Sequence, residues 1–217
     1  MRTIKKFTIP AILQDKGSQW LKEYLDDPNN LTKKTRYRHP EIKQALIKET
    51  GSKCVYCESK IGHNTPGDVE HKTPSSKVPT LHYSWENMTI ACSECNRRKN
   101  DYYSHADGFV DPYVDLVEEM FEHHGPIVLS KTGCKRAEIA VRQLELSSSA
   151  RFHLVSKKIE KIEQVCHVLE RIKHEGNAIL KDLLIISLKE MANSTTEFSA
   201  MVLTVLEHKA PELEWRG

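Results

Sequence analysis

The sequence lacks long apolar runs and carries almost no net charge. No stretch approaches the roughly 20 apolar residues that a membrane-spanning helix needs, and the opening segment MRTIKKFTIP has no apolar core of the kind found in signal peptides. We therefore expect no membrane association and a cytoplasmic location. The formal net charge is only +2, so a general basic coat for nucleic acid is excluded and any such contact must come from local patches.

A disulfide framework, internal repeats and low-complexity tracts are also absent. Six cysteines without a signal peptide argue against a disulfide scaffold. Apolar residues make up 39% and charged residues 29% of the chain, which is an ordinary globular balance. A chain of 217 residues can build one good core and one small extra module.

Composition divides the chain into three regions. Residues 1–50 are basic and partly helical, with a predicted helix over 40–50 and a cluster of cations, KKTRYRH, at 33–39. That cluster either follows a phosphate backbone or is a solvated face. Residues 51–115 hold most of the cysteines and show little periodicity, which is typical of a module built around a metal. Within this region MTIAC predicts a strand and SECNRRKND a short helix.

Residues 116–217 are predicted to be helical. Apolar residues recur at spacings of three and four from Phe152 to Ile172, which predicts one long helix ending near Gly176 or Asn177. AILKDLLIISLKEM (178–191) is apolar around most of its circumference, so we expect it to be buried on more than one side. A third helix is predicted over 196–209.

Two C-x-x-C pairs carry the strongest chemical signal. Two residues between thiols let both sulfurs reach one tetrahedral ion, so Cys54, Cys57, Cys92 and Cys95 together predict a closed structural zinc site. A redox-active pair is the weaker alternative, because it would need only one such motif after a strand. Cys134 and Cys166 are single, and we interpret them as small buried apolar residues.

A polar set surrounds the cysteine pairs. Glu70 and His71 lie between them, Asn87 precedes the second pair, and Asn96 follows it at once. Glu70 and Asn96 offer oxygen ligands to a hard divalent cation, and a neutral imidazole can take a proton from an attacking water. These residue types suit metal-assisted phosphodiester hydrolysis.

The segments CVYC, DVEHKTP and ENMTIACSECNRRKND resemble an HNH endonuclease of the ββα-metal kind, in its zinc-knuckle variant. The resemblance covers roughly residues 50–115. Within this family the sequence is similar to the PtuB group, the nuclease subunits of Septu-type and some retron-type anti-phage systems. The resemblance implies an α+β fold, in which a small zinc-stabilised ββα-metal module (51–115) is embedded in a mostly α-helical chain.

The resemblance also implies a role for each site residue. His71 stands at the position of the general base, and Glu70 and Asn96 at the two positions that hold a catalytic Mg²⁺ or Mn²⁺ ion. Asn87 matches the residue that keeps the two strands and the base in register. Lys99 matches a phosphate-contacting cation. Arg97 and Arg98 are further candidates for substrate contacts, with simple solvation equally expected.

Four lesser signals remain open. Asp68 either orients His71 or is solvated. For His63, His82 and His105, a surface position is the favoured interpretation and an approach to the site the alternative.

Three functions compete. The first is an endonuclease acting on DNA, with RNA such as tRNA as the alternative substrate. The second is a non-catalytic zinc-knuckle binding module. The third is an adaptor that works through the helical region at 116–217. The resemblance further implies a PtuA-like ABC-type ATPase as partner in a hetero-oligomer, docked on that helical region.

Overall fold

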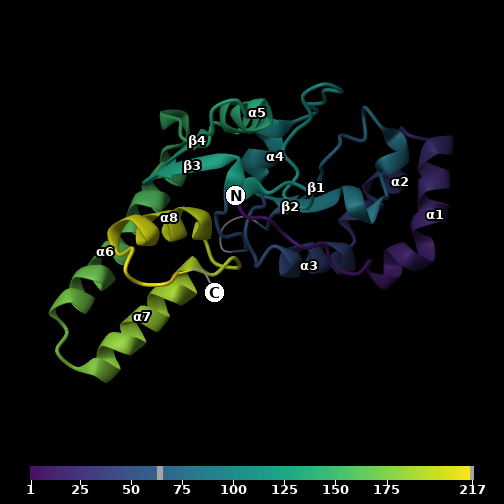
Figure 1. Ribbon diagram of the computed structural model, residues 1–217. Helices are drawn as coiled ribbons and strands as arrows, with labels where there is room; N and C mark the ends of the chain where they lie inside the picture. Colours follow the sequence, from purple (N-terminus) through teal and green to yellow (C-terminus); the bar gives the residue numbers. More distant parts are fainter. Residues whose placement is uncertain (63–65, 216–217) are drawn as a thin grey trace.

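The computed structural model describes residues 1–62 and 66–215, and it confirms the α+β class. Figure 1 shows the helices and strands in chain order: α1 (Ala11–Asp26), α2 (Leu31–Thr35), α3 (Pro40–Glu49), β1 (Asp68–His71), β2 (Met88–Ala91), α4 (Ser93–Lys99), β3 (Phe121–His124), β4 (Ile127–Ser130), α5 (Lys135–Leu144), α6 (Phe152–His174), α7 (Ala178–Ala192) and α8 (Ser199–Lys209). No helix in these described ranges is long and apolar enough to cross a membrane.

The centre of the molecule is an antiparallel hairpin of β1 and β2, followed at once by α4 (Figure 1). Helix α3 packs against both strands, and α4 packs against β1. Helix α3 begins with Pro40 in its first turn, where a missing N–H costs nothing, and the chain turns at Gly51 with a positive φ. The predicted helix over 40–50, the strand at MTIAC and the short helix after it are all confirmed.

A second hairpin, β3–β4, lies in a region that the sequence predicts to be helical. Phe121 pairs with Ser130 and His124 with Ile127. Phe121 and Val128 are buried, and α8 and α5 pack against the two strands. The sequence analysis did not predict this hairpin, and the bounds of the helical region 116–217 stay a prediction. Neither FEHH nor IVLS alternates apolar and polar residues over its four positions, so neither segment predicts a strand.

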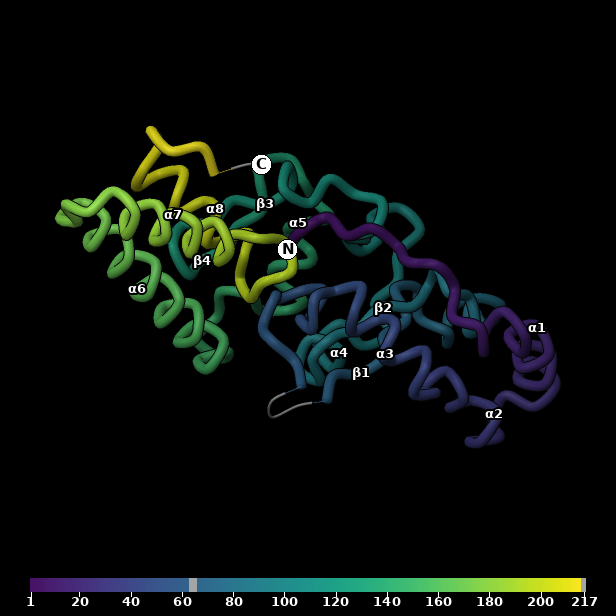
Figure 2. Tube along the Cα trace, turned by 90° about the horizontal axis from the view of Figure 1, so that it is seen from below, coloured from purple at the N-terminus to yellow at the C-terminus, as the bar shows by residue number. Residues whose placement is uncertain are grey.

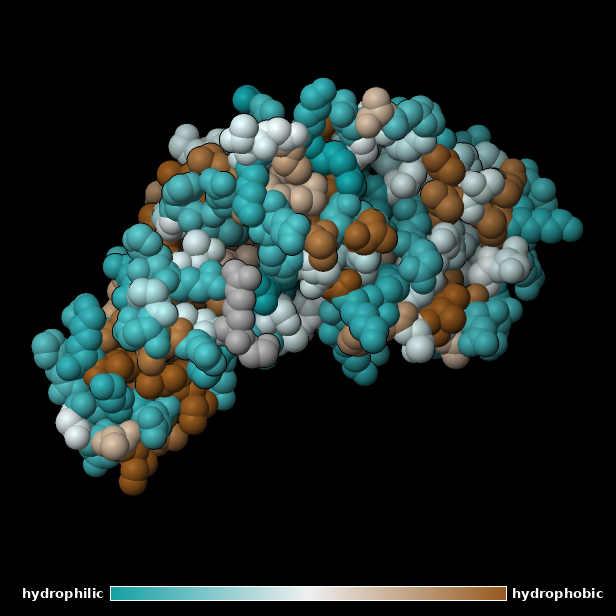
Figure 3. All heavy atoms as spheres, in the orientation of Figure 1, coloured by the Kyte–Doolittle hydropathy of each residue, from teal (hydrophilic) through white to brown (hydrophobic). Residues whose placement is uncertain are grey.

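The arm formed by α6 and α7 projects from one end of the molecule, and α1 and α2 form the other end (Figures 1 and 2). The long helix predicted over 152–172 is confirmed as α6. The expectation that α7 is buried on more than one side is wrong, because its exposed apolar residues are Ile179 (72% exposed), Leu180, Leu183 and Ile186. Among the described elements, α6 and α8 make the main contacts with this helix, and the four residues just named stay exposed on it. Apolar atoms are visible over this arm in Figure 3.

Packing crosses both boundaries of the three-region division. Across the first boundary, Trp85 Nε1 donates to the carbonyl oxygen of Phe7 (2.8 Å). The buried ammonium of Lys53 donates to Glu58 (2.7 Å) and to Ser199 in α8 (3.1 Å). At Gly51, with φ of +65°, a Cβ would lie 2.6 Å from the carbonyl oxygen of Thr195. The regions share one core, and the division into 1–50, 51–115 and 116–217 stays a prediction about folding units.

Candidate active site and zinc centre

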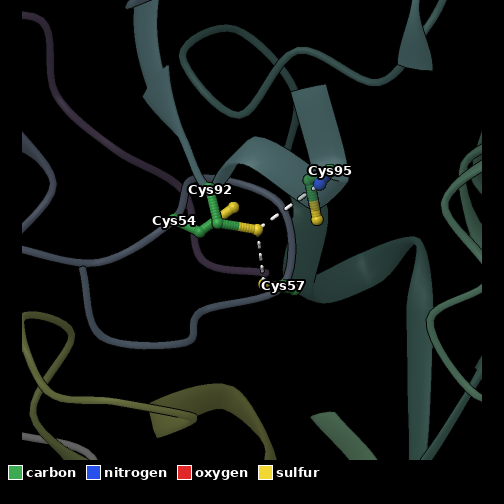
Figure 4. Close-up of side chains that lie close together, drawn as sticks. All are labelled: Cys54, Cys57, Cys92 and Cys95. Carbon is green, nitrogen blue, oxygen red and sulfur yellow. Dashed lines mark hydrogen bonds between the residues drawn. The ribbon is translucent and has the colours of Figure 1, made fainter. Parts of the chain in front are cut away.

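The four cysteines of the two C-x-x-C pairs meet beside the start of α4 (Figure 4). Their sulfur atoms all lie within 4.8 Å of one another, and the Cys57 and Cys92 sulfurs are 3.8 Å apart. A tetrahedral zinc ion with Zn–S bonds of about 2.3 Å places its sulfurs about 3.8 Å apart. The donor set and its spacing therefore fit the structural zinc site expected from the sequence.

A buried arginine that lies outside the two C-x-x-C motifs contacts this cysteine cluster. Arg151 Nη1 donates to Cys95 Sγ (3.2 Å) and to the carbonyl oxygen of Leu144 (3.1 Å). Burial lowers the pKa of Arg151, but the nearby sulfurs outweigh it and hold that pKa above its ordinary value. Four thiolates around Zn²⁺ carry a net negative charge, which this guanidinium offsets. Arg151 lies 56 residues from Cys95, so no local pattern in the sequence could have identified it.

Glu70 and His71 line one cleft of about 480 Å³. Neighbouring residues of a regular strand point to opposite faces. Here β1 ends at His71, and the next amide, from Lys72, donates to the carbonyl of Asn87. The regular strand nevertheless ends at His71, and both residues line the cleft.

The imidazole of His71 is held in one orientation. Its Nε2 lies 2.8 Å from the carbonyl oxygen of His82, and since a carbonyl only accepts, this nitrogen carries the proton. Nδ1 is left as the basic nitrogen. Burial lowers the pKa of His71 to about 4, so the ring is neutral at physiological pH. A neutral ring with one nitrogen free is the form that a general base requires.

Glu70 and Asn96, which both carry side-chain oxygen atoms, line the same cleft. Lys99 Nζ lies 2.6 Å from Glu70 Oε1, yet that oxygen is buried without an aligned hydrogen bond. Burial raises the pKa of Glu70, although Lys99 opposes this shift. The side chain of Asn96 has no hydrogen-bond partner among the described residues. The Asn96 amide oxygen therefore suits a hard divalent cation, and the Glu70 carboxylate, which is paired with Lys99, offers the second oxygen ligand.

Asn87 clamps the segment that follows β1. Its side-chain oxygen accepts from the Thr73 amide (2.8 Å), and its nitrogen donates to the carbonyl oxygens of Thr73 (2.9 Å) and Leu81 (3.3 Å). These bonds span the loop that carries the His82 carbonyl. The contacts match the register-holding role that the resemblance implies.

The three candidate cations of α4 lie in different places. Arg97 lines the cleft and is exposed, with a bidentate pair to Glu94. Arg98 pairs with Glu94 and with Glu145, which directly follows the next helix, α5. Lys99 is fully buried. The structure thus gives a protein partner to Lys99, for which a phosphate contact was expected, and to Arg98, for which phosphate contact and solvation were equally expected.

This strand–strand–helix site, closed by four sulfurs, corresponds to a known family. Residues 54–102 match the model of the HNH endonuclease family. The chain contains an HNH endonuclease domain. The domain identifies the chain as a nuclease, and its matched range includes both cysteine pairs and the four polar residues singled out from the sequence.

Similarity to known proteins extends beyond the HNH domain. The chain is 27% identical over 214 residues to Septu protein PtuB of Bacillus thuringiensis, covering 94% of this chain and 80% of that protein. It is 29% identical over 162 residues to Septu protein PtuB of Bacillus mycoides, covering 68% of this chain and 53% of that protein.

Residues that precede the HNH domain also line its cleft. Lys34 and Tyr37 come from the basic cluster at 33–39, and the Tyr37 ring meets the His71 ring edge-on at 4.7 Å. Asp68 lines the cleft as well, but no described contact joins it to His71.

Of the three histidines left open by the sequence, His82 also lines the cleft and is 2% exposed, so its interpretation as a surface residue is wrong. His105 is exposed as expected, and His63 lies outside the described residues.

Proposed function

We propose that the chain is a metal-dependent endonuclease that hydrolyses phosphodiester bonds in nucleic acid, with DNA favoured over RNA. The observation that carries the proposal is the convergence in one cleft of a neutral histidine, a buried carboxylate and an amide. His71 is the general base, and Glu70 and Asn96 hold one Mg²⁺ or Mn²⁺ ion. The zinc held by the four cysteines is structural.

Each of these side chains has a separate role in the proposed reaction. Nδ1 of His71 takes the proton of a water molecule, which attacks phosphorus as the bond to the leaving oxygen breaks. A divalent ion, when bound by Glu70 and Asn96, stabilises the charge on that oxygen. Arg97 and Lys34, which line the same cleft, are the cations best placed to meet the neighbouring phosphates.

The proposal predicts metal-dependent cleavage that requires His71. The full-length zinc-loaded chain should be incubated with supercoiled DNA and with tRNA, each with Mg²⁺, with Mn²⁺ and without added metal. The wild type should cut one of them only with added metal, and His71→Ala should not. Cleavage that persists in His71→Ala would show that the base is misassigned. If the chain bound nucleic acid but cut none of it under any of these conditions, even with the partner ATPase added, a zinc-knuckle binding module would be favoured.

We also propose that the chain works in a Septu-type system with a PtuA-like ABC-type ATPase. Support comes from the similarity to two proteins named Septu protein PtuB, which extends far beyond residues 54–102. The retron link has no support among these relatives and stays a prediction. A net charge of +2 and few base-reading groups also suit a nuclease whose specificity comes from a partner.

The open apolar face of α7 is the proposed docking surface. Leu183 is 55% and Ile186 51% exposed, and a partner that covers them removes apolar area from water. Leu183→Glu with Ile186→Glu should abolish co-purification with the ATPase while zinc content is kept. Lys181→Glu is the matched control, because this exposed residue lies about 200° around the helix from Leu183. Retained binding in the double variant would exclude this face.

A further inference from the structure

His82 contacts the proposed base and two aromatic residues of the N-terminal region. Its carbonyl oxygen accepts from His71 Nε2 (2.8 Å), and the two imidazole rings stack at 4.9 Å with an interplanar angle of 17°. The ring of His82 also stacks on Tyr24 of α1 at 4.0 Å. Tyr37 meets it edge-on at 5.2 Å.

Both nitrogens of the His82 ring are used. Nε2 lies 2.8 Å from the carbonyl oxygen of Lys34, so it carries the proton and donates. Nδ1 then accepts from the hydroxyl of Ser75, also at 2.8 Å. Burial lowers the pKa of His82, in keeping with this neutral form. The His82 ring thereby connects its own turn to Lys34 in the N-terminal region and to Ser75 in the loop after β1.

We infer that His82 is a positioning residue, whose ring fixes the carbonyl that orients the proposed base, His71. Any residue type offers a carbonyl, but only a side chain with one donor and one acceptor, at imidazole spacing, makes both ring contacts. The carbonyl directly follows the short 3₁₀ turn Pro79–Leu81, which Asn87 holds from the other side through the Leu81 carbonyl. Small displacements of a catalytic group cost large factors in rate.

The inference rests on the proposed function of His71, and it differs from a purely packing role in a measurable way. His82→Phe keeps a flat ring for stacking but removes both hydrogen bonds. His82→Gln keeps an amide that can donate to the Lys34 carbonyl. His82→Phe should lower kcat roughly 10–100-fold with KM and zinc content unchanged. His82→Gln should retain more activity than His82→Phe, and His124→Phe, at an exposed histidine of β3, should behave as wild type.

A second readout does not depend on cleavage. Nitrogen NMR of ¹⁵N-histidine-labelled protein, with the His71 signal assigned by its loss in His71→Ala, reports which ring nitrogen carries the proton. Wild type should show the Nε2–H tautomer at His71, and His82→Phe a mixture of the two. If the wild type cut no nucleic acid, the proposed function would fail while this test of the His82 contact would still stand.

Two results would overturn the inference. One is a kcat of His82→Phe within about twofold of wild type together with an unchanged His71 tautomer. The other is an equal loss of activity in the Phe and Gln variants with that tautomer unchanged, which would indicate packing alone. Should His82→Phe fail to fold, Ser75→Ala and His82→Gln decide the matter by the same two readouts, since each removes part of the ring's hydrogen bonding.

Discussion

Replacing Lys99 by methionine should destabilise the domain rather than weaken its grip on phosphate. Lys99 is fully buried, its ammonium lies 2.6 Å from Glu70 Oε1, and it also donates to the carbonyl oxygen of His71 (3.0 Å). Methionine has a similar length and apolar stem, so the change removes the charge and keeps most of the packing.

The expected loss of stability depends on the buried Glu70 carboxylate that Lys99→Met leaves without a partner. Removing one partner of a buried ion pair leaves an uncompensated charge, which typically costs about 3–5 kcal/mol. Glu70 can escape part of this cost by taking up a proton, because burial already raises its pKa. We therefore expect about 3 kcal/mol of lost stability for Lys99→Met at neutral pH. Mg²⁺ or Mn²⁺ should restore part of it, since a bound cation supplies the missing positive charge.

The assay is urea unfolding of zinc-loaded protein, with and without added Mg²⁺, for wild type, Lys99→Met, Glu70→Gln and the double variant. The double variant should be more stable than Lys99→Met alone, because it leaves no buried charge unpaired. A Lys99→Met protein that unfolds within about 0.5 kcal/mol of wild type, with a raised KM for nucleic acid, would refute this reasoning. That pattern would restore Lys99 as a phosphate contact.

Three further predictions concern the frame of the site. Gly51→Ala should lower the free energy of unfolding by about 1–3 kcal/mol, and by more than Gly133→Ala does. Both glycines have a positive φ, but only Gly51 lies close to the Thr195 carbonyl. Equal melting temperatures of the two variants would contradict this prediction. Arg151→Met should weaken zinc binding about 10–100-fold, measured in a competition with a chromophoric chelator. Lys157→Met is the exposed control and should leave zinc affinity unchanged. An unchanged zinc affinity of Arg151→Met would exclude a role for Arg151. Burial lowers the pKa of His123 to about 3, so as pH falls below the unfolded value of about 6.5 the unfolded chain takes up a proton that the folded chain does not. Between pH 7 and pH 5 the wild type should lose about 2 kcal/mol more stability than His123→Phe in zinc-saturated buffer, and parallel pH curves would contradict that pKa.

Local patterns in the sequence predicted much of this site. The spacing of the cysteines sets the zinc site because the two residues between each pair of thiols fix the reach of both sulfurs. Asn96 follows from its position directly after the second pair, in the helix that those cysteines begin. The long helix α6 was predictable because 23 residues repeat its apolar stripe many times.

Contacts between distant segments could not be predicted in this way. His82 has no motif, and its burial depends on Tyr24 and Lys34, more than 45 residues away. Arg151 reaches Cys95 across 56 residues. The sequences of β3 and β4 show no alternating pattern of apolar and polar residues. Apolar residues around most of α7 predicted that this helix is buried, but no other part of the chain that the structure describes covers its exposed apolar residues.

The most direct test of the account measures single-turnover cleavage against the concentration of Mn²⁺ for wild type, His71→Ala and Asn96→Ala. If His71 is the base and Asn96 a metal ligand, His71→Ala should lose about 10²–10⁴-fold in maximal rate at an unchanged half-saturating metal concentration. Asn96→Ala should instead need more metal and recover much of its rate at saturation. A His71→Ala enzyme whose rate recovers with excess Mn²⁺, or an Asn96→Ala enzyme with an unchanged metal requirement, would contradict the assignment of the site.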